Sequence, residues 1–437
     1  MAGPHWRACR HSPFPYHSRM SIALGLSAAA VAAAAEVLRP VVHRTPLMRS
    51  ERLSDELGTT VWLKREDLQI GRSYKVRGAH TLISSVGEAE RERGVVCASA
   101  GNHAQGVARS CSALGIRGRI FIPSATPRQK RERIQAIGGS WVELIVGGAT
   151  YDEASDAALA ASAETGAVLA HPFDDPRTIV GQGTVAIELS EQCPEPFGTV
   201  VVPVGGGGLI AGMALWLRER CPGVRIVGAE PEGAASMRAA LAAGRPVALP
   251  SVDTFVDGAA VGRVGALTYP LVRDLVDEVV TVPEGAVCTE MLSLYQVEGV
   301  IAEPAGALAS AAARRLARTR GEAGVVCIVS GGNNDVSRYA DILERSLVHE
   351  GLKHYFLVSF PQQPGALRRF LDGVLGPDND ITLFEYVKKS NRETGPALVG
   401  LELARAGDLA SLLDRMAASS LRIERVPPGS PLFKFLV

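Results

Sequence analysis

Short apolar runs alternate with longer amphipathic stretches between about residues 60 and 345. The runs are continuously apolar, which is typical of strands buried on both faces of a parallel sheet with helices around it. There are more strand–helix units than one compact sheet holds, so we expect an α/β fold with two lobes. The predicted strands include the runs at 61–63, 95–97, 119–122, 200–202, 225–227 and 325–329.

Two of these predicted strands end in similar residues. The run at 95–98 continues into Ser99-Ala100-Gly101-Asn102, and the run at 325–329 into Ser330-Gly331-Gly332-Asn333. Each Asn is predicted to stand at the start of a helix. Such residues serve as ordinary helix caps. Alternatively, because ligands of open α/β sheets bind at the carboxyl ends of strands, the two ends face each other across a cleft.

The pattern changes after about residue 349. A β-α-β-β-α order is predicted there, which is typical of a small ferredoxin-like unit. Its sequence contains no nucleophile–base pair and no metal-ligand spacing, so we interpret it as an accessory ligand-binding module. The predicted strands are at 354–360, 381–387 and 397–403, with helices from 364 and near 407–418.

The N-terminal region imitates a secretory signal at residues 20–35, but Ala dominates the run and the pattern continues as far as Arg39. Ala is the strongest helix former, so a helix that ends before Pro40 is the favoured interpretation. Residues 1–19 are expected to be a disordered extension. No apolar run reaches the roughly 20 residues of a membrane helix, so we expect no membrane contact and a cytoplasmic location.

Charge and cysteine content narrow the functions further. Lys+Arg and Asp+Glu both number 46, without a basic block, so no nucleic-acid partner is expected. The seven cysteines form no CxxC pair, which predicts free thiols in a reducing compartment and no metal site. Gly accounts for 46 of the 437 residues, above the average of about 7%, and this excess needs an explanation.

Four glycines are consecutive: Gly205, Gly206, Gly207 and Gly208 follow a predicted strand and precede Leu209 of a predicted helix. Backbone N–H groups at such a junction converge on an anion, and phosphate is the expected ligand. The segment is neither a P-loop nor a dinucleotide fingerprint, so it favours a phosphorylated cofactor. A flexible tight turn is the alternative.

The reactive partner of such a cofactor is expected to be a lysine. Lys75 follows Gly71-Arg72-Ser73-Tyr74 at the start of a predicted helix. Cations are disfavoured there, which helps to lower the pKa of the amine for attack on a carbonyl. Taken alone, a solvated surface lysine is the better interpretation.

These segments together resemble the pyridoxal-phosphate enzymes of fold type II, which share the fold of the tryptophan synthase β-subunit, and most of all the biosynthetic threonine dehydratases. The resemblance extends over about residues 36–340 and includes further segments in order, at 43–47, 64–67, 171–175, 181–184 and 303–306. It implies a catalytic domain at 20–345, with a large lobe at 20–68 and 172–345 and a small lobe at 69–171, followed by an α+β ACT-like domain at 350–437.

The resemblance also implies roles for individual residues. Lys75 would hold pyridoxal 5′-phosphate covalently and later remove the α-proton of the substrate. The four glycines with the Leu209 amide would bind the phosphate, Asn102 the 3′-oxygen, and Ser330 the pyridine nitrogen. A neutral hydroxyl there makes the ring a weaker electron sink than a carboxylate would, which favours β-elimination over transamination.

Backbone N–H groups at a predicted helix start are suited to the substrate carboxylate. The segment that would supply them is Ser99, Ala100, Gly101, Asn102 and His103. His103 is equally well interpreted as a loop histidine without a catalytic part.

The implied activity is β-elimination of L-threonine to 2-oxobutanoate and ammonia, the first committed step of isoleucine biosynthesis. Segments 360–367 and 384–393 resemble the ACT-like regulatory domain of these enzymes in its single-copy form. Feedback control by isoleucine, with valine as a candidate opposing effector, and a homotetramer are therefore expected.

Three alternatives remain open at this point. They are a serine/threonine dehydratase of broader specificity, an enzyme of β-replacement or of serine racemisation, and an amino-acid sensor on an inactive scaffold. The sensor is disfavoured because Lys75, the four glycines and Ser330 are all present.

Overall fold

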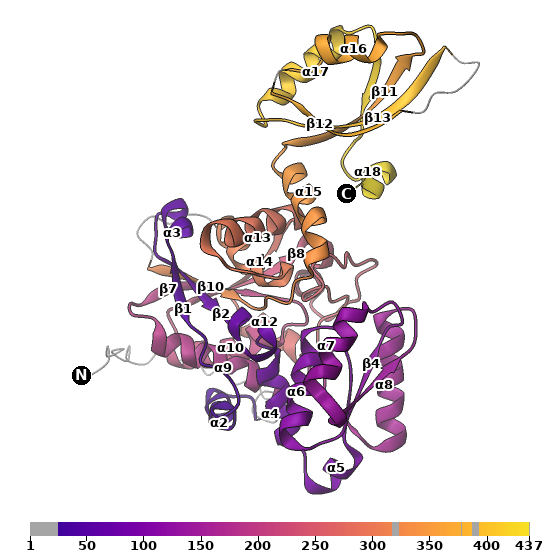
Figure 1. The fold of residues 1–437 in the computed structure, drawn as a ribbon. Helices are drawn as coiled ribbons and strands as arrows, with labels where there is room; N and C mark the ends of the chain where they lie inside the picture. The colour runs from indigo at the N-terminus through magenta and orange to yellow at the C-terminus, as the bar shows by residue number, and fades with distance from the viewer. Residues whose placement is uncertain (1–24, 317–322, 377, 387–392, 437) are drawn as a thin grey trace. The chain divides into compact units, whose positions relative to one another are not determined.

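The computed structural model describes residues 25–316, 323–376, 378–386 and 393–436, which fall into two compact units (Figure 1). Unit 1 contains the chain up to Glu284 and Ser293–Asn334, and unit 2 contains Gly285–Leu292 and the chain from Asp335 onward. The extension expected to be disordered, residues 1–19, lies outside the described residues.

Unit 1 contains two sheets, and the predicted two-lobed α/β fold is confirmed. The large sheet has the order β1-β2-β10-β7-β8-β9, in which all neighbours are parallel except β1 and β2. The small sheet has the order β5-β4-β3-β6 and is entirely parallel. The strands are β1 (Leu47–Ser50), β2 (Val61–Arg65), β3 (Val95–Ala98), β4 (Gly118–Ile122), β5 (Val142–Val146), β6 (Val168–Leu169), β7 (Phe197–Pro203), β8 (Arg225–Pro231), β9 (Glu278–Val282) and β10 (Gly324–Val329).

The apolar pattern correctly predicted the interior strands of both sheets. All six predicted runs lie within strands, whereas β1, β9, β5 and β6, which the pattern did not single out, are the four edge strands. Edge strands are covered less completely, so their sequences carry weaker apolar runs.

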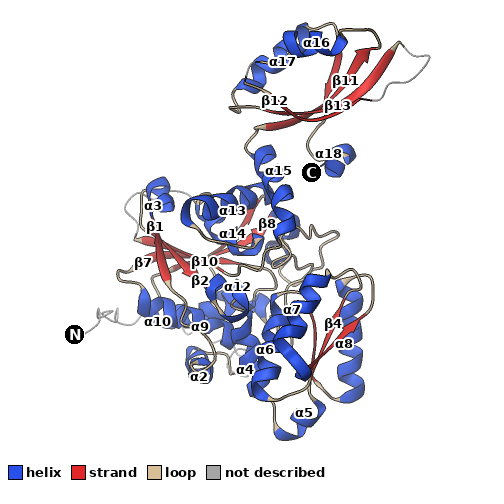
Figure 2. Ribbon diagram, viewed as in Figure 1, coloured by secondary structure: helices blue, strands red, loops and turns tan. Residues whose placement is uncertain are grey.

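Helices cover both faces of each sheet (Figure 2). In the small sheet, Val95 and Cys97 of β3 pack in one apolar cluster with helix α6, while Val96 and Ala98 pack with α8 on the other face. This two-sided burial explains the continuous apolar runs. The helices are α2 (Ala28–Leu38), α3 (Glu51–Leu57), α4 (Lys75–Ser84), α5 (Glu88–Arg93), α6 (Asn102–Leu114), α7 (Arg128–Gly138), α8 (Tyr151–Thr165), α9 (Pro176–Gln192), α10 (Gly208–Arg220), α11 (Ser236–Ala243), α12 (Thr268–Leu275), α14 (Pro304–Ala313) and α13 (Glu284–Glu298), which contains residues of both units.

Glycines also allow helices of unit 1 to approach one another closely. A Cβ on Gly212 of α10 would lie 2.1 Å from the Ile179 carbonyl oxygen of α9, and one on Gly181 would lie 2.8 Å from the Arg77 carbonyl oxygen of α4. No side chain fits at such distances. Part of the glycine excess is therefore explained by helix packing.

The N-terminal helix is confirmed within the described residues. α2 begins after its N-cap Ser27, whose hydroxyl accepts a hydrogen bond from Ala30 N–H, and it ends at Leu38, before Pro40. None of the described helices is long and apolar enough to cross a membrane. Six of the seven cysteines are described, and all six are buried free thiols.

The prediction that Asn333 stands at a helix start is wrong, although Asn102 does begin α6 as predicted. After β10 the chain pairs with Ser73 through Gly331, and α15 begins only at Tyr339. The side-chain amide of Asn333 donates to the Gly71 carbonyl oxygen at 2.7 Å. The segment after β10 is held against another part of the chain and does not turn directly into a helix.

Unit 2 confirms the α+β module predicted at the C-terminus. Its antiparallel sheet has the order β12-β13-β11-β14, and α16 and α17 share its apolar core. The short strand β14, which was not predicted, completes the ferredoxin-like order. Residues 387–392, at the end of one predicted strand and in one ACT-like segment, lie outside the described residues. The elements are α15 (Tyr339–His349), β11 (Lys353–Pro361), α16 (Ala366–Gly373), β12 (Asp380–Tyr386), β13 (Thr394–Glu402), α17 (Asp408–Ala418), β14 (Arg422–Arg425) and α18 (Pro431–Leu436).

Candidate functional site

Lys75 is the first residue of α4 and lies beside the end of β10. Tyr74 N–H donates to the Ser330 carbonyl oxygen at 3.2 Å, and Ser73 pairs with Gly331. The Lys75 ammonium donates to the Pro172 carbonyl oxygen at 3.2 Å. The start of α4 is therefore joined to the carboxyl end of a central strand, where ligands of such sheets bind.

The surroundings of Lys75 favour its neutral amine. Burial of the amine end lowers the pKa of Lys75 to about 8, although the nearby Glu303 carboxylate opposes the shift. An ordinary lysine has a pKa of about 10.4, so a much larger share of Lys75 is unprotonated near neutral pH. A neutral amine in a partly enclosed position can attack a carbonyl group.

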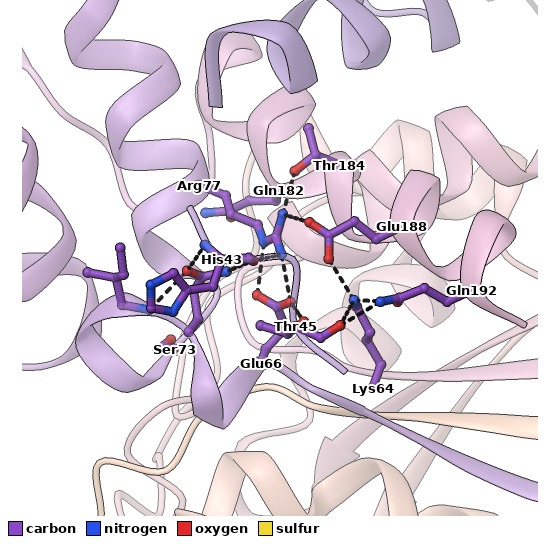
Figure 3. Close-up of polar contacts among 12 residues, drawn as sticks. His43, Thr45, Lys64, Glu66, Ser73, Arg77, Gln182, Thr184, Glu188 and Gln192 are labelled. Carbon is purple, nitrogen blue, oxygen red and sulfur yellow. Dashed lines mark hydrogen bonds and ion pairs between the residues drawn. The ribbon is translucent and has the colours of Figure 1, made fainter. Parts of the chain in front are cut away.

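A buried ion network holds the helix that carries Lys75 (Figure 3). Arg77, in the first turn of α4, is 1% exposed and makes two parallel bonds to Glu66, at 2.9 and 2.8 Å. It also donates to Glu188 of α9 at 2.7 Å. Lys64 of β2 donates to the second oxygen of Glu188 at 2.6 Å. The network joins α4 to α9 and to the large sheet.

The central pair of the network, Glu66 and Arg77, keeps its charges in spite of burial. Burial disfavours both ions of the central pair, yet Arg77 lowers the pKa of Glu66, while Glu66 and Glu188 raise the pKa of Arg77. Burial lowers the pKa of Lys64, with the same two carboxylates opposing the shift. The two cations and two carboxylates balance one another, which is the condition for burying charge without a large loss of stability.

The four glycines form the junction between β7 and α10. Gly207 has φ +90°, a left-handed conformation that favours glycine. A Cβ on Gly206 would lie 2.2 Å from the Phe173 ring, and one on Gly207 would lie 2.7 Å from the end of Met237. Gly206 leaves no room for a side chain, and the junction places backbone N–H groups at the positive end of the 13-residue helix α10, where an anion is stabilised.

The segment from Pro172 to Asp174 connects the glycine junction with Lys75. Pro172 accepts the hydrogen bond of the Lys75 amine, and Phe173 packs against Gly206. The Asp174 carboxylate accepts from three backbone N–H groups at the start of α12, at 2.8, 2.8 and 3.2 Å. These contacts place three consecutive residues between the amine and the expected phosphate site.

Thr268, the first residue of α12, braces the glycine junction directly. It is fully buried, and its hydroxyl donates to the Gly206 carbonyl oxygen at 2.6 Å. Because Asp174 fixes the start of α12, the orientation of the Gly206 peptide depends on both side chains.

The two similar strand ends meet in the structure. The Asn102 Oδ1 accepts from the side-chain amide of Asn333 at 2.6 Å, and the Asn102 side-chain amide donates to Glu303 at 2.7 Å. Burial raises the pKa of Glu303 to about 7, with Asp257 adding to the shift and the bond from Asn102 opposing it. The expectation that the two ends face each other is supported over that of two unrelated caps.

The remaining predicted residues lie around this centre. Gly101 N–H donates to the Ser99 hydroxyl at 3.2 Å, and a Cβ on Gly101 would meet no atom within 4 Å. Ser330 is buried, and its hydroxyl donates to the Ala305 carbonyl oxygen at 3.2 Å. The open space beside Gly101 suits a small ligand group, and the Ser330 oxygen retains capacity as an acceptor.

His103 is buried, and the loop-histidine interpretation fits it better than a catalytic one. Its Nε2 lies 2.7 Å from the Ala170 carbonyl oxygen. Burial lowers the pKa of His103 to about 3, and the charge of Lys75 adds to the shift. The ring is neutral at physiological pH and holds the start of α6 against the small sheet.

Several residues of this centre were not among the predicted site residues: Phe173, Asp174, Thr268, Glu303 and Asn333. All but Thr268 lie in or directly beside segments that the sequence analysis singled out. Thr268 had no sequence signal, because its role arises only from the packing of α12 against the glycine junction.

Comparisons with known proteins agree with this geometry. A family profile described as "Pyridoxal-phosphate dependent enzyme" matches residues 38–331. A second profile, described as "C-terminal regulatory domain of Threonine dehydratase", matches residues 344–436.

Curated relatives extend over nearly the whole chain. The biosynthetic L-threonine dehydratase IlvA of Mycobacterium tuberculosis (strain ATCC 25618 / H37Rv) is 58% identical, over 94% of this chain and 96% of that protein. The Bacillus subtilis (strain 168) protein of the same name is 46% identical, over 92% of this chain and 95% of that protein.

Solved structures resemble this chain over about three quarters of its length. The processed form of threonine deaminase isoform 2 from Solanum lycopersicum has a TM-score of 0.70 and 38% identity, covering 75% of this chain and 94% of that one. Maize serine racemase has a TM-score of 0.68 and 37% identity, covering 74% of this chain and 98% of that one.

The residues at the site fit pyridoxal phosphate. The glycine junction brings bare backbone, packed by Phe173 and Met237, to the start of a helix suited to a phosphate. Burial lowers the pKa of Lys75 to about 8, which raises the share of its neutral amine, and the buried Ser330 oxygen retains acceptor capacity toward a ring N–H. These groups lie on segments that the Pro172–Asp174 region and the end of β10 hold together.

We expect Arg77→Met to destabilise the protein by about 3–5 kcal/mol, because it leaves the buried Glu66 carboxylate without its cation. Arg128→Met is the matched control. Its partner Glu132 is exposed, so the loss should stay within about 1 kcal/mol. Thermal and urea unfolding of both variants measure the difference in the free energy of unfolding. Equal stabilities would contradict a central role for the buried network.

Proposed function

This chain belongs to the pyridoxal-phosphate-dependent enzymes and, among them, to the biosynthetic threonine dehydratases, and from that membership we propose that it converts L-threonine to 2-oxobutanoate and ammonia. The observation that carries the proposal is the match of both parts of the chain. The catalytic profile covers unit 1, and the threonine dehydratase regulatory profile covers residues 344–436.

The other activities are less well supported. Serine racemase resembles this chain over 74% of its length, whereas the dehydratase relatives match 94% of it and the regulatory profile matches the C-terminal part. A sensor on an inactive scaffold does not require a lysine whose burial lowers its pKa to about 8, beside a glycine cradle without room for side chains.

We assign the binding roles as follows. Backbone N–H groups of Gly205 to Gly208 and of Leu209 hold the cofactor phosphate, Asn102 contacts the 3′-oxygen, and Ser330 contacts the pyridine nitrogen. The N–H groups from Ser99 to His103 receive the substrate carboxylate at the positive end of α6. Pyridoxal phosphate, when bound, stabilises negative charge at the substrate α-carbon.

Lys75 carries the proton transfer in this proposal. Its neutral amine, favoured by burial, takes the α-proton at Nζ, and the β-hydroxyl leaves as water after protonation. The enamine released from the site takes up water and yields 2-oxobutanoate and ammonia. The enclosed position of Lys75 near Pro172 keeps the amine aimed into the site.

Regulation and assembly belong to the same proposal. We propose that unit 2 mediates feedback inhibition by isoleucine, with valine as a candidate opposing effector, since its sequence matches the regulatory domain of threonine dehydratase. A homotetramer, and lobes at 20–68 plus 172–345 and at 69–171, remain our expectations from the family resemblance. The cytoplasmic location remains an expectation from the sequence composition.

Lys75→Ala should abolish the visible absorbance of the covalently held cofactor and reduce kcat for threonine by at least about 10²–10⁴-fold, since it removes the proton acceptor. Arg128→Ala, which removes an exposed cation paired with the exposed Glu132, should retain both signals. Absorbance spectra and steady-state assays of the two purified variants measure both effects. Turnover retained without Lys75 would refute the assignment.

Replacing Thr268 tests the bracing of the glycine junction. Thr268→Val removes the hydroxyl that donates to Gly206 and should weaken pyridoxal-phosphate binding about tenfold, because a buried carbonyl loses its partner. Thr268→Ser keeps the hydroxyl and should restore the affinity. Absorbance titration of the apoenzymes measures this, and unchanged affinity in the valine variant would argue against the role.

Steady-state rates with threonine and with serine, each with and without isoleucine, test substrate and regulation together. We expect a higher kcat/KM for threonine, and isoleucine should raise the threonine concentration needed for half-maximal rate. Rates that do not respond to isoleucine would exclude the proposed feedback but leave the dehydratase activity intact.

A further inference from the structure

Glu303 is a buried carboxyl group beside the site, and the proposed reaction does not use it. It is the N-cap of α14, but its side chain makes no hydrogen bond to the start of that helix. It is 4% exposed, and a Cβ on Gly331 would lie 2.4 Å from its Oε1, so bare backbone packs directly against the carboxyl group. Burying a carboxyl group costs free energy, and capping of α14 does not offset that cost.

The carboxyl group accepts two hydrogen bonds from separate segments of the chain. Its Oε1 accepts from the side-chain amide of Asn102 at 2.7 Å, and its Oε2 accepts from the backbone N–H of Asn333 at 3.2 Å. The side-chain amide of Asn333 in turn donates to the Oδ1 of Asn102 at 2.6 Å and to the Gly71 carbonyl oxygen at 2.7 Å. Glu303 and Asn333 therefore hold the two ends of the Asn102 side-chain amide.

This arrangement leaves one N–H group of Asn102 for a ligand. A side-chain amide has two N–H donors and one oxygen that accepts. Asn333 engages the oxygen of Asn102 and Glu303 engages one donor, while the second donor has no partner among the residues that the structure describes. Because an ionised carboxylate can only accept, it turns the NH₂ end of Asn102 toward itself. The orientation of Asn102 therefore depends on the charge of Glu303.

Glu303 changes its charge near neutral pH. Burial raises the pKa of Glu303 to about 7, and the negative charge of Asp257 adds to the shift, while the two hydrogen bonds and the charge of Lys130 oppose it. Above this pKa both carboxylate oxygens accept, whereas below it one oxygen carries a proton and donates instead. The charged and ionisable groups that face the carboxyl group are Asp257, Lys130 and Arg133 of α7, and Tyr74 and Lys75 at the start of α4.

We propose that Glu303 is a positioning residue for the cofactor: as a carboxylate it orients the Asn102 amide toward the 3′-oxygen of pyridoxal phosphate, and on protonation it releases that amide. The proposal rests on the part that Asn102 has in the proposed function. It makes the affinity for the cofactor depend on pH near neutrality through a side chain that acts by way of Asn102.

Titration of the full-length apoenzyme with pyridoxal phosphate, followed by absorbance, tests this role. Glu303→Gln has the shape of the protonated acid, with one acceptor oxygen and one donor group, but it cannot ionise. At about pH 8 the unsubstituted protein should bind the cofactor about tenfold more tightly than this variant, and at about pH 6 the two affinities should converge. Comparing the two proteins at each pH removes the titration of the cofactor and of Lys75, which both proteins share.

A double-mutant cycle shows whether Glu303 acts through Asn102. In an Asn102→Ala background, Glu303→Gln should change the cofactor affinity by less than about twofold, because the amide that Glu303 orients is gone. A tenfold effect that persists without Asn102 would overturn the proposal, since Glu303 would then act on the cofactor directly. Tighter binding by the Glu303→Gln variant at about pH 8 would overturn it as well.

Two surface variants move the pH dependence without changing the buried carboxyl group, so the test stays valid if a change of Glu303 disturbs the fold. Asp257→Asn removes a negative charge that raises the pKa of Glu303, so the pH at which the cofactor affinity changes should fall. Lys130→Ala removes a nearby positive charge and should raise that pH. Arg128→Ala, an exposed change on the same helix, is the matched control and should leave it unchanged. The same pH dependence in all three variants would contradict the proposal.

The outcomes separate this role from the proposed reaction. If the cofactor binds and threonine is converted, but Glu303→Gln has the affinity of the unsubstituted protein at both pH values, the positioning role fails and the dehydratase activity stands. If the unsubstituted protein binds no pyridoxal phosphate, both proposals fail. Thermal unfolding at both pH values identifies the variants that fold normally.

Discussion

The buried Glu66 and the partly exposed Glu188 contact two buried cations, Arg77 and Lys64, and this cluster holds the first turn of α4 against the large sheet. Burying Glu66, Arg77 or Lys64 without its partners would cost several kcal/mol, so their pairing is a condition for the packing of α4. Lys75 is two residues from Arg77, and its position is therefore set by charges that take no part in chemistry.

The rest of the site depends on that fixed position. The amine of Lys75 contacts Pro172, and the next residue, Phe173, packs against Gly206. Asp174 then fixes the start of α12, and Thr268 of that helix hydrogen-bonds Gly206. Catalysis in this family requires the lysine amine and the cofactor phosphate to be held at a fixed distance, and flexible loops alone hold such a distance poorly. Here the three consecutive residues Pro172 to Asp174 connect the amine of Lys75 with the glycine junction.

The glycine excess has two physical causes, and the sequence showed one of them. Four adjacent glycines between a strand and a helix indicate a ligand that the backbone approaches closely, and the structure places them so that side chains would collide. Scattered glycines such as Gly181 and Gly212 carry no such signal. They mark helix crossings between α4, α9 and α10, and only the packed helices reveal the need for a missing Cβ.

Interior strands, the order of elements in both units and the site segments followed from the sequence, because periodicity and local backbone chemistry are properties of neighbouring residues. Edge strands, the course of the chain after Ser330, and the parts played by Glu303 and Thr268 did not. Those features depend on contacts between residues far apart in the chain, such as the bond between Asn102 and Asn333. Such contacts exist only once the sheets and helices are packed, so the tertiary structure alone decided them.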